Sequence, residues 1–313
     1  MDVDTYMKAH RASGVIVLKN GEVLLERYGL GRTADDVWLA QSVGKTVTAF
    51  LVGAAIQDGY IRSMDDLVAD YIPQLKGGAY DGVTIRQLLT MTSGVKFDED
   101  YVNPDGDGSQ IWVWPFAKED PAAYLGRLPR ADRPGAKFVY NNGDAFLAGI
   151  LVSKATGKYL SAYLAEKLWK PFGMEKPAYW VVSPYGLEGG DGTLSMTLRD
   201  YARFGQFMLD GGKSNGVQVV PLGWVADATR AQVTLPSEFE DENGATDYGY
   251  YWWIYKDAYA ARGHAGQAIY VYPEDNVVIA VNSAWPESEK ARDHWQALYA
   301  FVQALHAAAV VHR

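Results

Sequence analysis

The chain has 313 residues, of which 48% are hydrophobic and 21% charged, a composition typical of a soluble globular protein with one or two domains. Its formal net charge of −9 argues against nucleic acid as a partner, because nucleic-acid-binding proteins present a basic surface. The sequence contains no cysteine, which excludes disulfides, thiol catalysis and cysteine-ligated zinc within this chain.

The first predicted elements form a β-hairpin. Segments 14–19 (GVIVLK) and 22–29 (EVLLERYG) flank Asn20-Gly21, a dipeptide typical of a two-residue hairpin turn. A helix is predicted next over about residues 43–57, where apolar residues recur at helical spacing. Further predicted helices are one with a capping box at Thr84-x-x-Gln87, two at about 143–156 and 159–170, and one that opens at Thr197-x-x-Asp200.

Strand patterns return near the end of the chain. The predicted strands are 248–256 (YGYYWWIYK), 267–273 and 276–284, followed by a long helix over about 288–310. Because β segments come first and last, the simplest arrangement is one antiparallel sheet built from both chain ends. We therefore expect an α+β fold, with helices flanking the sheet. The expected domains are a sheet domain from 1–59 and 190–313 and an inserted, mainly helical domain from 60–189.

The first residues carry acidic side chains where a secretion signal would carry positive charge. The apolar runs at 49–56 and 145–152 are too short to span a membrane. These features predict a soluble, cytoplasmic protein without a membrane partner. A chain from which a leader had been removed would look the same.

A Ser-x-x-Lys pattern occurs twice, at Ser42–Lys45 and at Ser93–Lys96. Ser42 opens a predicted helix, which places Lys45 one turn away on the same side. A desolvated lysine can take the proton of a serine hydroxyl, and the start of a helix offers free N–H groups to an oxyanion. Ser93 follows a helix and precedes a glycine, so its lysine need not converge on it. The alternative for the first pair is a plain helix cap and a solvated charge.

Two further motifs follow in the chain, Tyr140-Asn141-Asn142 and His264-Ala265-Gly266-Gln267. With Ser42–Lys45 and in this order, they resemble the motifs of the penicillin-recognising serine hydrolases, which include class C β-lactamases, DD-peptidases and related carboxylesterases. Additional segments resemble the 6-aminohexanoate-dimer (nylon-oligomer) hydrolase branch over nearly the whole chain. These segments are 80–94, 98–104, 207–212, 263–267, 283–286 and 294–295.

The resemblance implies a β-lactamase/transpeptidase-like fold and a role for each matching residue. Ser42 would be the nucleophile, Lys45 its base and Tyr140 a proton relay. The backbone N–H groups of Ser42 and Gln267 would form the oxyanion hole. The remaining matches would support the site or bind substrate, and they are Asn142, His264, Gly266 and Tyr101.

Two departures from the family pattern bear on specificity. His264 stands where β-lactamases carry a lysine that helps to hold an anionic substrate, so we expect little β-lactam hydrolysis. Segment 105–116 does not follow the nylon-oligomer pattern, so amide specificity does not transfer. Its aromatic residues are candidates for the wall of the cleft, and they are Trp112, Trp114 and Phe116.

The sequence therefore predicts a serine hydrolase that acts on small carboxylic esters by an acyl-enzyme. The alternatives are an amidase of the 6-aminohexanoate-oligomer type, a β-lactamase or DD-peptidase-like penicillin-binding protein, and a non-catalytic binding protein on the same fold. The mechanism requires no metal or organic cofactor. The expected partner is a small-molecule ester or amide, and a homodimer is left open.

Overall fold

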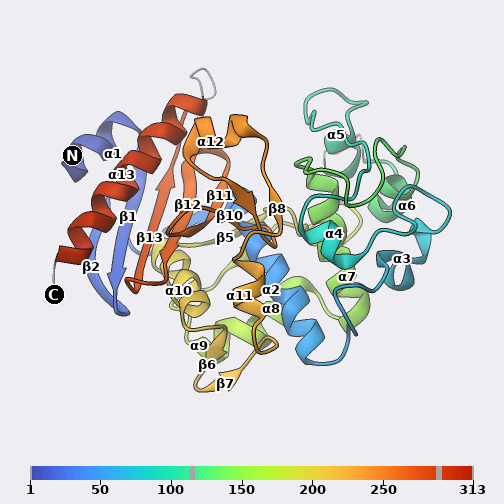
Figure 1. Ribbon diagram of the computed structural model, residues 1–313, viewed down its shortest axis with the longest axis horizontal. Coiled ribbons are helices and arrows are strands. Elements are labelled where there is room, and N and C mark those ends of the chain that lie inside the picture. Colours follow the sequence, from blue (N-terminus) through green and yellow to red (C-terminus); the bar gives the residue numbers. More distant parts are fainter. Residues whose placement is uncertain (1, 113–116, 287–290, 312–313) are drawn as a thin grey trace.

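The computed structural model describes residues 2–112, 117–286 and 291–311, and an eight-stranded antiparallel sheet joins the two ends of the chain (Figure 1). β1 (Ala12–Lys19) lies between β2 (Glu22–Tyr28) and β13 (Val277–Ser283), so the expected sheet from both chain ends is confirmed. Beyond β13 the order continues with β12 (Gln267–Tyr272), β11 (Tyr259–Gly263), β10 (Trp253–Ile254), β9 (Asp247–Tyr248) and β8 (Val233–Thr234).

The turn between β1 and β2 is the predicted two-residue hairpin. Asn20 and Gly21 have φ angles of 53° and 80°, so both lie in the left-handed region that a type I′ turn requires. Asparagine and glycine enter this region at low cost, which explains why this dipeptide fixes the turn.

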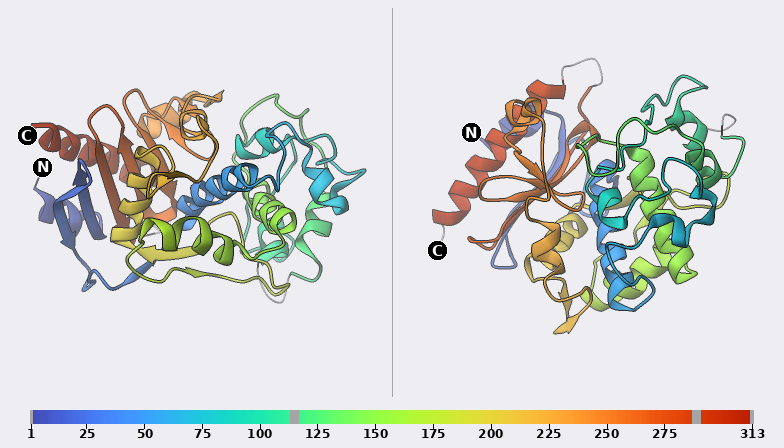
Figure 2. Two further views of the ribbon diagram at one scale, coloured as in Figure 1. Left: turned by 90° about the horizontal axis from the view of Figure 1, so that it is seen from below. Right: turned by 45° about the vertical axis from the view of Figure 1, so that its right-hand side comes forward.

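Helices cover both faces of the sheet, as the alternation of side chains along β12 demonstrates. Ile269 faces α10 (Leu198–Leu209), where a Cβ on Gly205 would lie 2.8 Å from its Cγ2. The next residue, Tyr270, faces the opposite way and stacks on Tyr299 of α13 (Ala291–Val311). The N-terminal helix α1 (Val3–Ala9) lies on the same face of the sheet as α13, where the rings of Tyr6 and Phe301 stack with 3.7 Å between their centroids. Figure 2 places both chain ends at the sheet end of the molecule, far from α3 to α7.

Two long helices form the centre of the helical part. α2 (Gly44–Gln57) and α7 (Asn142–Thr156) pack together, and nearly all of their side chains are buried. Figure 1 shows α2 between the sheet and the helices on the other side of the molecule. The shorter helices are α3 (Val68–Tyr71), α4 (Ile85–Leu89), α5 (Asp107–Trp112), α6 (Pro121–Gly126), α8 (Leu160–Leu164), α9 (Lys170–Phe172), α11 (Trp224–Ala228) and α12 (Ser237–Asn243).

The predicted capping signals and helices are confirmed. Thr84 and Gln87 form a reciprocal capping box at α4, and Thr197 accepts from the backbone N–H of Asp200 at the start of α10. A π-helical segment (Ala165–Trp169) joins α8 to α9 in the region predicted as one helix. α3 to α7 lie in the segment for which the sequence predicts an inserted domain, and that division of the chain stays a prediction.

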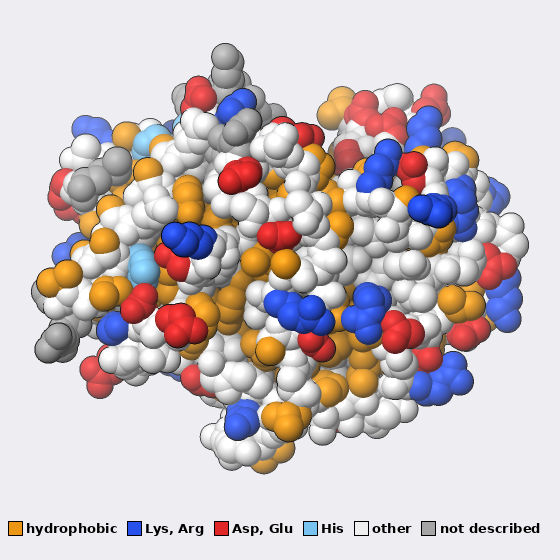
Figure 3. All heavy atoms as spheres, viewed as in Figure 1, with side chains coloured by type: hydrophobic (Ala, Val, Ile, Leu, Met, Phe, Trp, Pro, Cys, Tyr) orange, Lys and Arg blue, Asp and Glu red, His pale blue; other side chains and the backbone are white. Residues whose placement is uncertain are grey.

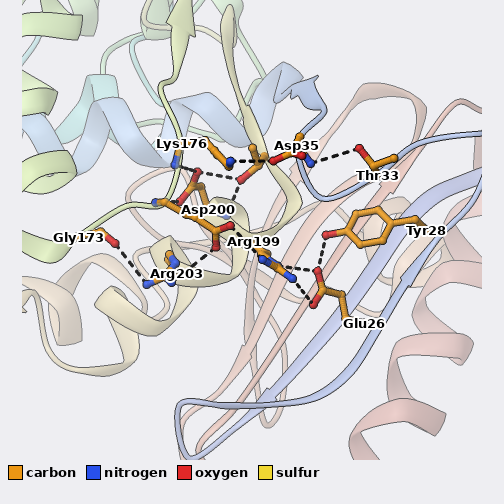
Figure 4. Close-up of polar contacts among 11 residues, drawn as sticks. Glu26, Tyr28, Thr33, Asp35, Gly173, Lys176, Arg199, Asp200 and Arg203 are labelled. Carbon is orange, nitrogen blue, oxygen red and sulfur yellow. Dashed lines mark hydrogen bonds and ion pairs between the residues drawn. The ribbon is translucent and has the colours of Figure 1, made fainter.

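A polar network ties β2 to α10 and to the loop before the small sheet (Figure 4). This sheet has the order β3 (Val37–Leu39), β5 (Leu194–Thr197), β4 (Tyr179–Trp180), and a separate hairpin pairs β6 (Lys213–Ser214) with β7 (Val217–Gln218). Arg199 pairs with Glu26 of β2 at 2.7 Å and with Glu175 at 3.0 Å. Its neighbour Asp200 accepts the backbone N–H groups of Glu175 and Lys176. Both residues therefore fasten the loop before β4 to the sheet.

The single strand predicted at 248–256 is wrong. The chain instead makes two short strands, β9 and β10, and Trp253 pairs back on Tyr248. Between them Tyr251 has a φ of 63°, and its N–H donates to the carbonyl of Leu89. Aromatic residues on both faces look like a buried strand in the sequence, but here they fill the core around a tight turn. Among the described residues, no helix has the length and apolar character of a membrane span.

Asp144, in the first turn of α7, is fully buried and accepts a hydrogen bond from the Tyr80 hydroxyl at 2.8 Å. Burial raises the pKa of this carboxyl to about 7. An aspartate in an unfolded chain ionises near pH ~3.9, so between these values the unfolded chain binds fewer protons than the folded chain. This group therefore makes the protein less stable as the pH rises from about 4 to 7, by up to roughly 4 kcal/mol.

Asp144→Asn is expected to remove this part of the pH dependence, because an amide does not ionise. Urea unfolding at pH 5 and pH 8 measures the effect as the change in the free energy of unfolding between the two values. The wild type should lose more stability than Asp144→Asn, whereas the exposed control Asp105→Asn should follow the wild type. Parallel losses in all three proteins would contradict the assignment.

Candidate active site

Ser42 lies in a 3-10 turn (Gln41–Val43) that runs directly into α2, so the helix starts as a tighter turn than the sequence predicts. The preceding residue, Gln41, has a φ of 50°, which is uncommon for a residue other than glycine. Such backbone strain persists only where the surrounding structure holds it, and it is concentrated at functional sites.

Glycines hold this turn between two neighbouring segments. A Cβ on Gly263, at the end of β11, would lie 2.6 Å from the carbonyl oxygen of Ala40. On the other side, a Cβ on Gly192 would lie 2.5 Å from the carbonyl oxygen of Gln41. Real Cβ atoms do not come so close, so only glycine permits both approaches. The backbone at Ser42 is thereby fixed between β11 and the 189–193 loop.

Lys45 is almost completely buried, with 1% of its surface exposed. Its Nζ donates to Ser42 Oγ at 2.8 Å and to the carbonyl oxygen of Asp191 at 2.6 Å. The first distance lies within the range in which a base can take the hydroxyl proton. Ser42 and Lys45 therefore converge as their spacing in the sequence predicts.

Tyr140 precedes α7, and its ring centroid lies 5.1 Å from Lys45 Nζ. The ring of Tyr140 also stacks on the ring of Trp253, with 6.2 Å between the ring centroids and an angle of 22° between the ring planes. Beyond Trp253 lies the buried guanidinium of Arg262, 4.6 Å from the indole centroid. The structure thus brings Tyr140 to Lys45 and fixes its ring by stacking.

The third motif forms a short turn (His264–Gly266) that leads into β12. The buried side chain of Gln267 donates to the carbonyl oxygen of Ser283 at 2.7 Å, which turns it toward β13. Gly266 has a φ of 88°, and a Cβ there would collide with the indole of Trp285. β12 packs against the 3-10 turn that contains Ser42, so the backbone at Gln267 lies beside that turn.

A cavity of about 430 Å³ opens at Ser42. Five of the predicted site residues line it, namely Ser42, Tyr101, Trp112, Asn142 and His264, together with Leu39, Gln41, Asp191, Gly192 and Thr193. The other four, Lys45, Tyr140, Gly266 and Gln267, are not among the residues that line it. The predicted cleft residues Trp114 and Phe116 fall outside the described residues. No group of three or more metal-ligating side chains occurs among the described residues.

Sequence reasoning missed two acidic residues at the site. Asp191 is buried and accepts from the indole N–H of Trp112 at 2.8 Å, which fixes that ring in the cavity wall. Desolvation raises the pKa of this carboxyl, against the opposing effect of Lys45. Glu99 accepts hydrogen bonds from Asn142 and Tyr101. Glu99 lies in segment 98–104, which matched the nylon-oligomer branch without giving this residue a role, and nothing in the glycine-rich loop around Asp191 indicated a site residue.

The second Ser-x-x-Lys copy lies away from the cavity. Ser93 is buried, and its hydroxyl accepts from the backbone N–H of Val95 at 3.2 Å. Lys96 is exposed, so this pair lacks the buried contact that joins Ser42 to Lys45. The turn context explains the difference, because a helix places residues three apart on the same side, whereas a turn does not fix the directions of their side chains in this way.

Comparison with known proteins gives one consistent family. The family model described as Beta-lactamase matches residues 2–303. The chain is 31% identical over 311 residues to the 6-aminohexanoate-dimer hydrolase of Paenarthrobacter ureafaciens, covering 95% of this chain and 78% of that protein.

Two solved structures extend the comparison. One is described as "Putative 6-aminohexanoate-dimer hydrolase from Bacillus anthracis"; it superposes with a TM-score of 0.84 at 25% identity and covers 98% of this chain and 82% of its own. A family VIII carboxylesterase has a TM-score of 0.69 at 17% identity, over 95% of this chain and 96% of its own, and shares the fold.

Proposed function

The chain belongs to the Beta-lactamase family and is a serine hydrolase of that family, and from this premise we propose that it hydrolyses small carboxylic esters through an acyl-enzyme on Ser42. The observation that carries the proposal is the 2.8 Å contact between Lys45 Nζ and Ser42 Oγ at the wall of a 430 Å³ cavity. A buried amine beside a serine hydroxyl is an arrangement that activates an otherwise weak nucleophile.

In the first half of the proposed reaction, Lys45 takes the Ser42 proton as Oγ attacks the ester carbonyl. The negative charge that develops on the carbonyl oxygen is stabilised by the backbone N–H groups of Ser42 and Gln267. Tyr140, held against Lys45, passes the proton to the leaving alkoxide. The products of this half are an alcohol and an ester between the acyl group and Ser42.

In the second half, water that enters the cavity attacks the acyl-enzyme. The same groups work in reverse, so the proton of the water passes through Tyr140 and Lys45 and returns to Ser42. Asn142 and Tyr101 contact the substrate, and Trp112 provides an apolar wall for a small acyl or aryl group.

Esters are the preferred substrate class because an alkoxide leaves more easily than an amide nitrogen and needs less exact protonation. The second candidate is an amidase that acts on aminohexanoate oligomers. It is supported by the 31% identity to the Paenarthrobacter hydrolase and by Tyr101, which lines the cavity. β-Lactams are disfavoured because His264 replaces the cationic lysine that would hold their carboxylate. A histidine side chain carries much less positive charge at neutral pH.

A substrate panel tests this order of preference. The panel consists of p-nitrophenyl acetate and butyrate, a linear aminohexanoate amide and the chromogenic β-lactam nitrocefin. We expect kcat/KM to be highest for the esters. Comparable values for the amide would favour the amidase, and a value for nitrocefin equal to or above the esters would identify a β-lactamase.

His264→Lys tests the same argument at one position. The residue is exposed at the cavity, so a lysine fits there without disturbing the core. We expect a lower KM for anionic substrates such as nitrocefin, by about 2- to 5-fold, and equal or lower kcat/KM for neutral esters. Steady-state kinetics on both substrates measure the change, and an unchanged KM for nitrocefin would remove His264 from the explanation of specificity.

A further inference from the structure

Glu99 joins two segments of the cavity wall without lining the cavity itself. Its Oε1 accepts the backbone N–H of Asn142 at 2.7 Å, and its Oε2 accepts from Asn142 Nδ2 at 2.5 Å. The hydroxyl of Tyr101 donates to the same Oε2 at 3.3 Å. One carboxylate thus binds two residues that line the cavity, one from α7 and one from the loop before α5.

The contacts with Asn142 determine how that side chain lies. Because Nδ2 donates to Glu99, the amide group is oriented with its nitrogen toward the carboxylate and its Oδ1 away from it. The backbone bond also satisfies one of the free N–H groups at the start of α7, where a negative charge is favourable. Without the Glu99 carboxylate, Asn142 loses both of these hydrogen bonds.

The charges around Glu99 include the base of the proposed reaction. Desolvation raises the pKa of Glu99, whereas the hydrogen bonds from Asn142 and the charge of Lys45 lower it. The other ionisable neighbours are Tyr101 on the same loop and Asp144 on α7, whose pKa is raised in part by Glu99.

We propose that Glu99 is a positioning residue for hydrolysis at Ser42, which holds Asn142 and Tyr101 at the cavity wall. The inference rests on the proposed function and adds a residue to its machinery. Glu99 acts on the reaction through Asn142 and Tyr101 and does not itself touch the substrate.

Glu99→Gln tests this inference. The amide has nearly the same shape, but it has no charge, and its own NH₂ group faces the NH₂ group of Asn142. We expect kcat/KM for p-nitrophenyl acetate to fall about 10- to 100-fold, the range for a lost hydrogen bond to a charged group. The loss should appear mainly as a higher KM, because the two residues that Glu99 holds contact the substrate in the proposed reaction, and kcat should change less.

The matched control is Glu119→Gln. Glu119 forms a surface ion pair with Arg127 and does not line the cavity, so its replacement should leave both kcat and KM as in the wild type. Figure 3 shows further acidic side chains over the loop that leads to α5. The control is needed because the loss of any one negative charge could in principle change the rate, whereas the inference concerns Glu99 alone.

The outcomes separate this inference from the proposed function. An inactive wild type would overturn the proposed function, whereas an active wild type with an equally active Glu99→Gln would overturn only the inference. A lower kcat with an unchanged KM would contradict the role of Glu99 in holding Asn142 and Tyr101. If Glu99→Gln does not fold, Glu99→Asp replaces it. Aspartate keeps the charge but is too short for all three bonds, so an unreduced kcat/KM in that variant would overturn the inference.

Discussion

Replacing Ser42 with alanine is expected to lower kcat for p-nitrophenyl esters at least about a thousandfold while the fold stays intact. Without the hydroxyl no acyl-enzyme can form, and water must attack the substrate directly. The side chain lies at the cavity and its backbone adopts the same turn with alanine, so circular dichroism and thermal unfolding should match the wild type. The expected effect is therefore on chemistry alone.

Ser93→Ala is the matched control, because Ser93 begins the other Ser-x-x-Lys copy. Its hydroxyl binds the local turn and the buried carboxyl of Asp144 and does not line the cavity, so this variant should retain nearly full activity and lose some stability. A fluorophosphonate probe followed by mass spectrometry gives an independent measure. The covalent adduct should be found on Ser42 in the wild type and in Ser93→Ala. An adduct on any other residue, or none at all, would contradict the assignment, and the latter would support a non-catalytic binding protein.

Lys45→Arg is expected to be nearly inactive, with kcat/KM reduced by a factor of roughly 100 to 10,000, the range for loss of a general base. Arginine keeps the positive charge but cannot give up its proton at any pH the protein survives. The buried amine also donates to the Asp191 carbonyl at 2.6 Å, and the larger guanidinium cannot reproduce both short contacts in the same space.

Lys96→Arg provides the comparison at the second copy of the motif. Lys96 is exposed and its change should leave kcat/KM as in the wild type. The measurement is steady-state kinetics from pH 6 to 10, since higher pH should not rescue Lys45→Arg. Substantial activity in Lys45→Arg at any of these pH values would remove Lys45 from the role of base.

The sequence by itself determined the elements whose signals are local. Asn20-Gly21 fixed the first hairpin because both residues accept a positive φ, and Thr84 and Gln87 fixed the start of α4 because they bond within one turn. Ser42 and Lys45 are likewise neighbours through helical spacing alone. The α+β fold and its sheet followed from the order of these elements.

Only the tertiary structure decided the parts of the site that depend on distant contacts. Glu99 and Asn142 are 43 residues apart, and Lys45 and Asp191 are 146 residues apart. Neither acidic residue stands in a periodic or capping pattern that could place its side chain. The tight turn between β9 and β10 escaped prediction for the same reason, since its N–H groups bond to Leu89 and Ala228 from other parts of the chain. The backbone groups of loops form hydrogen bonds with whichever segments the fold brings near, and a local sequence pattern does not indicate which segments these are.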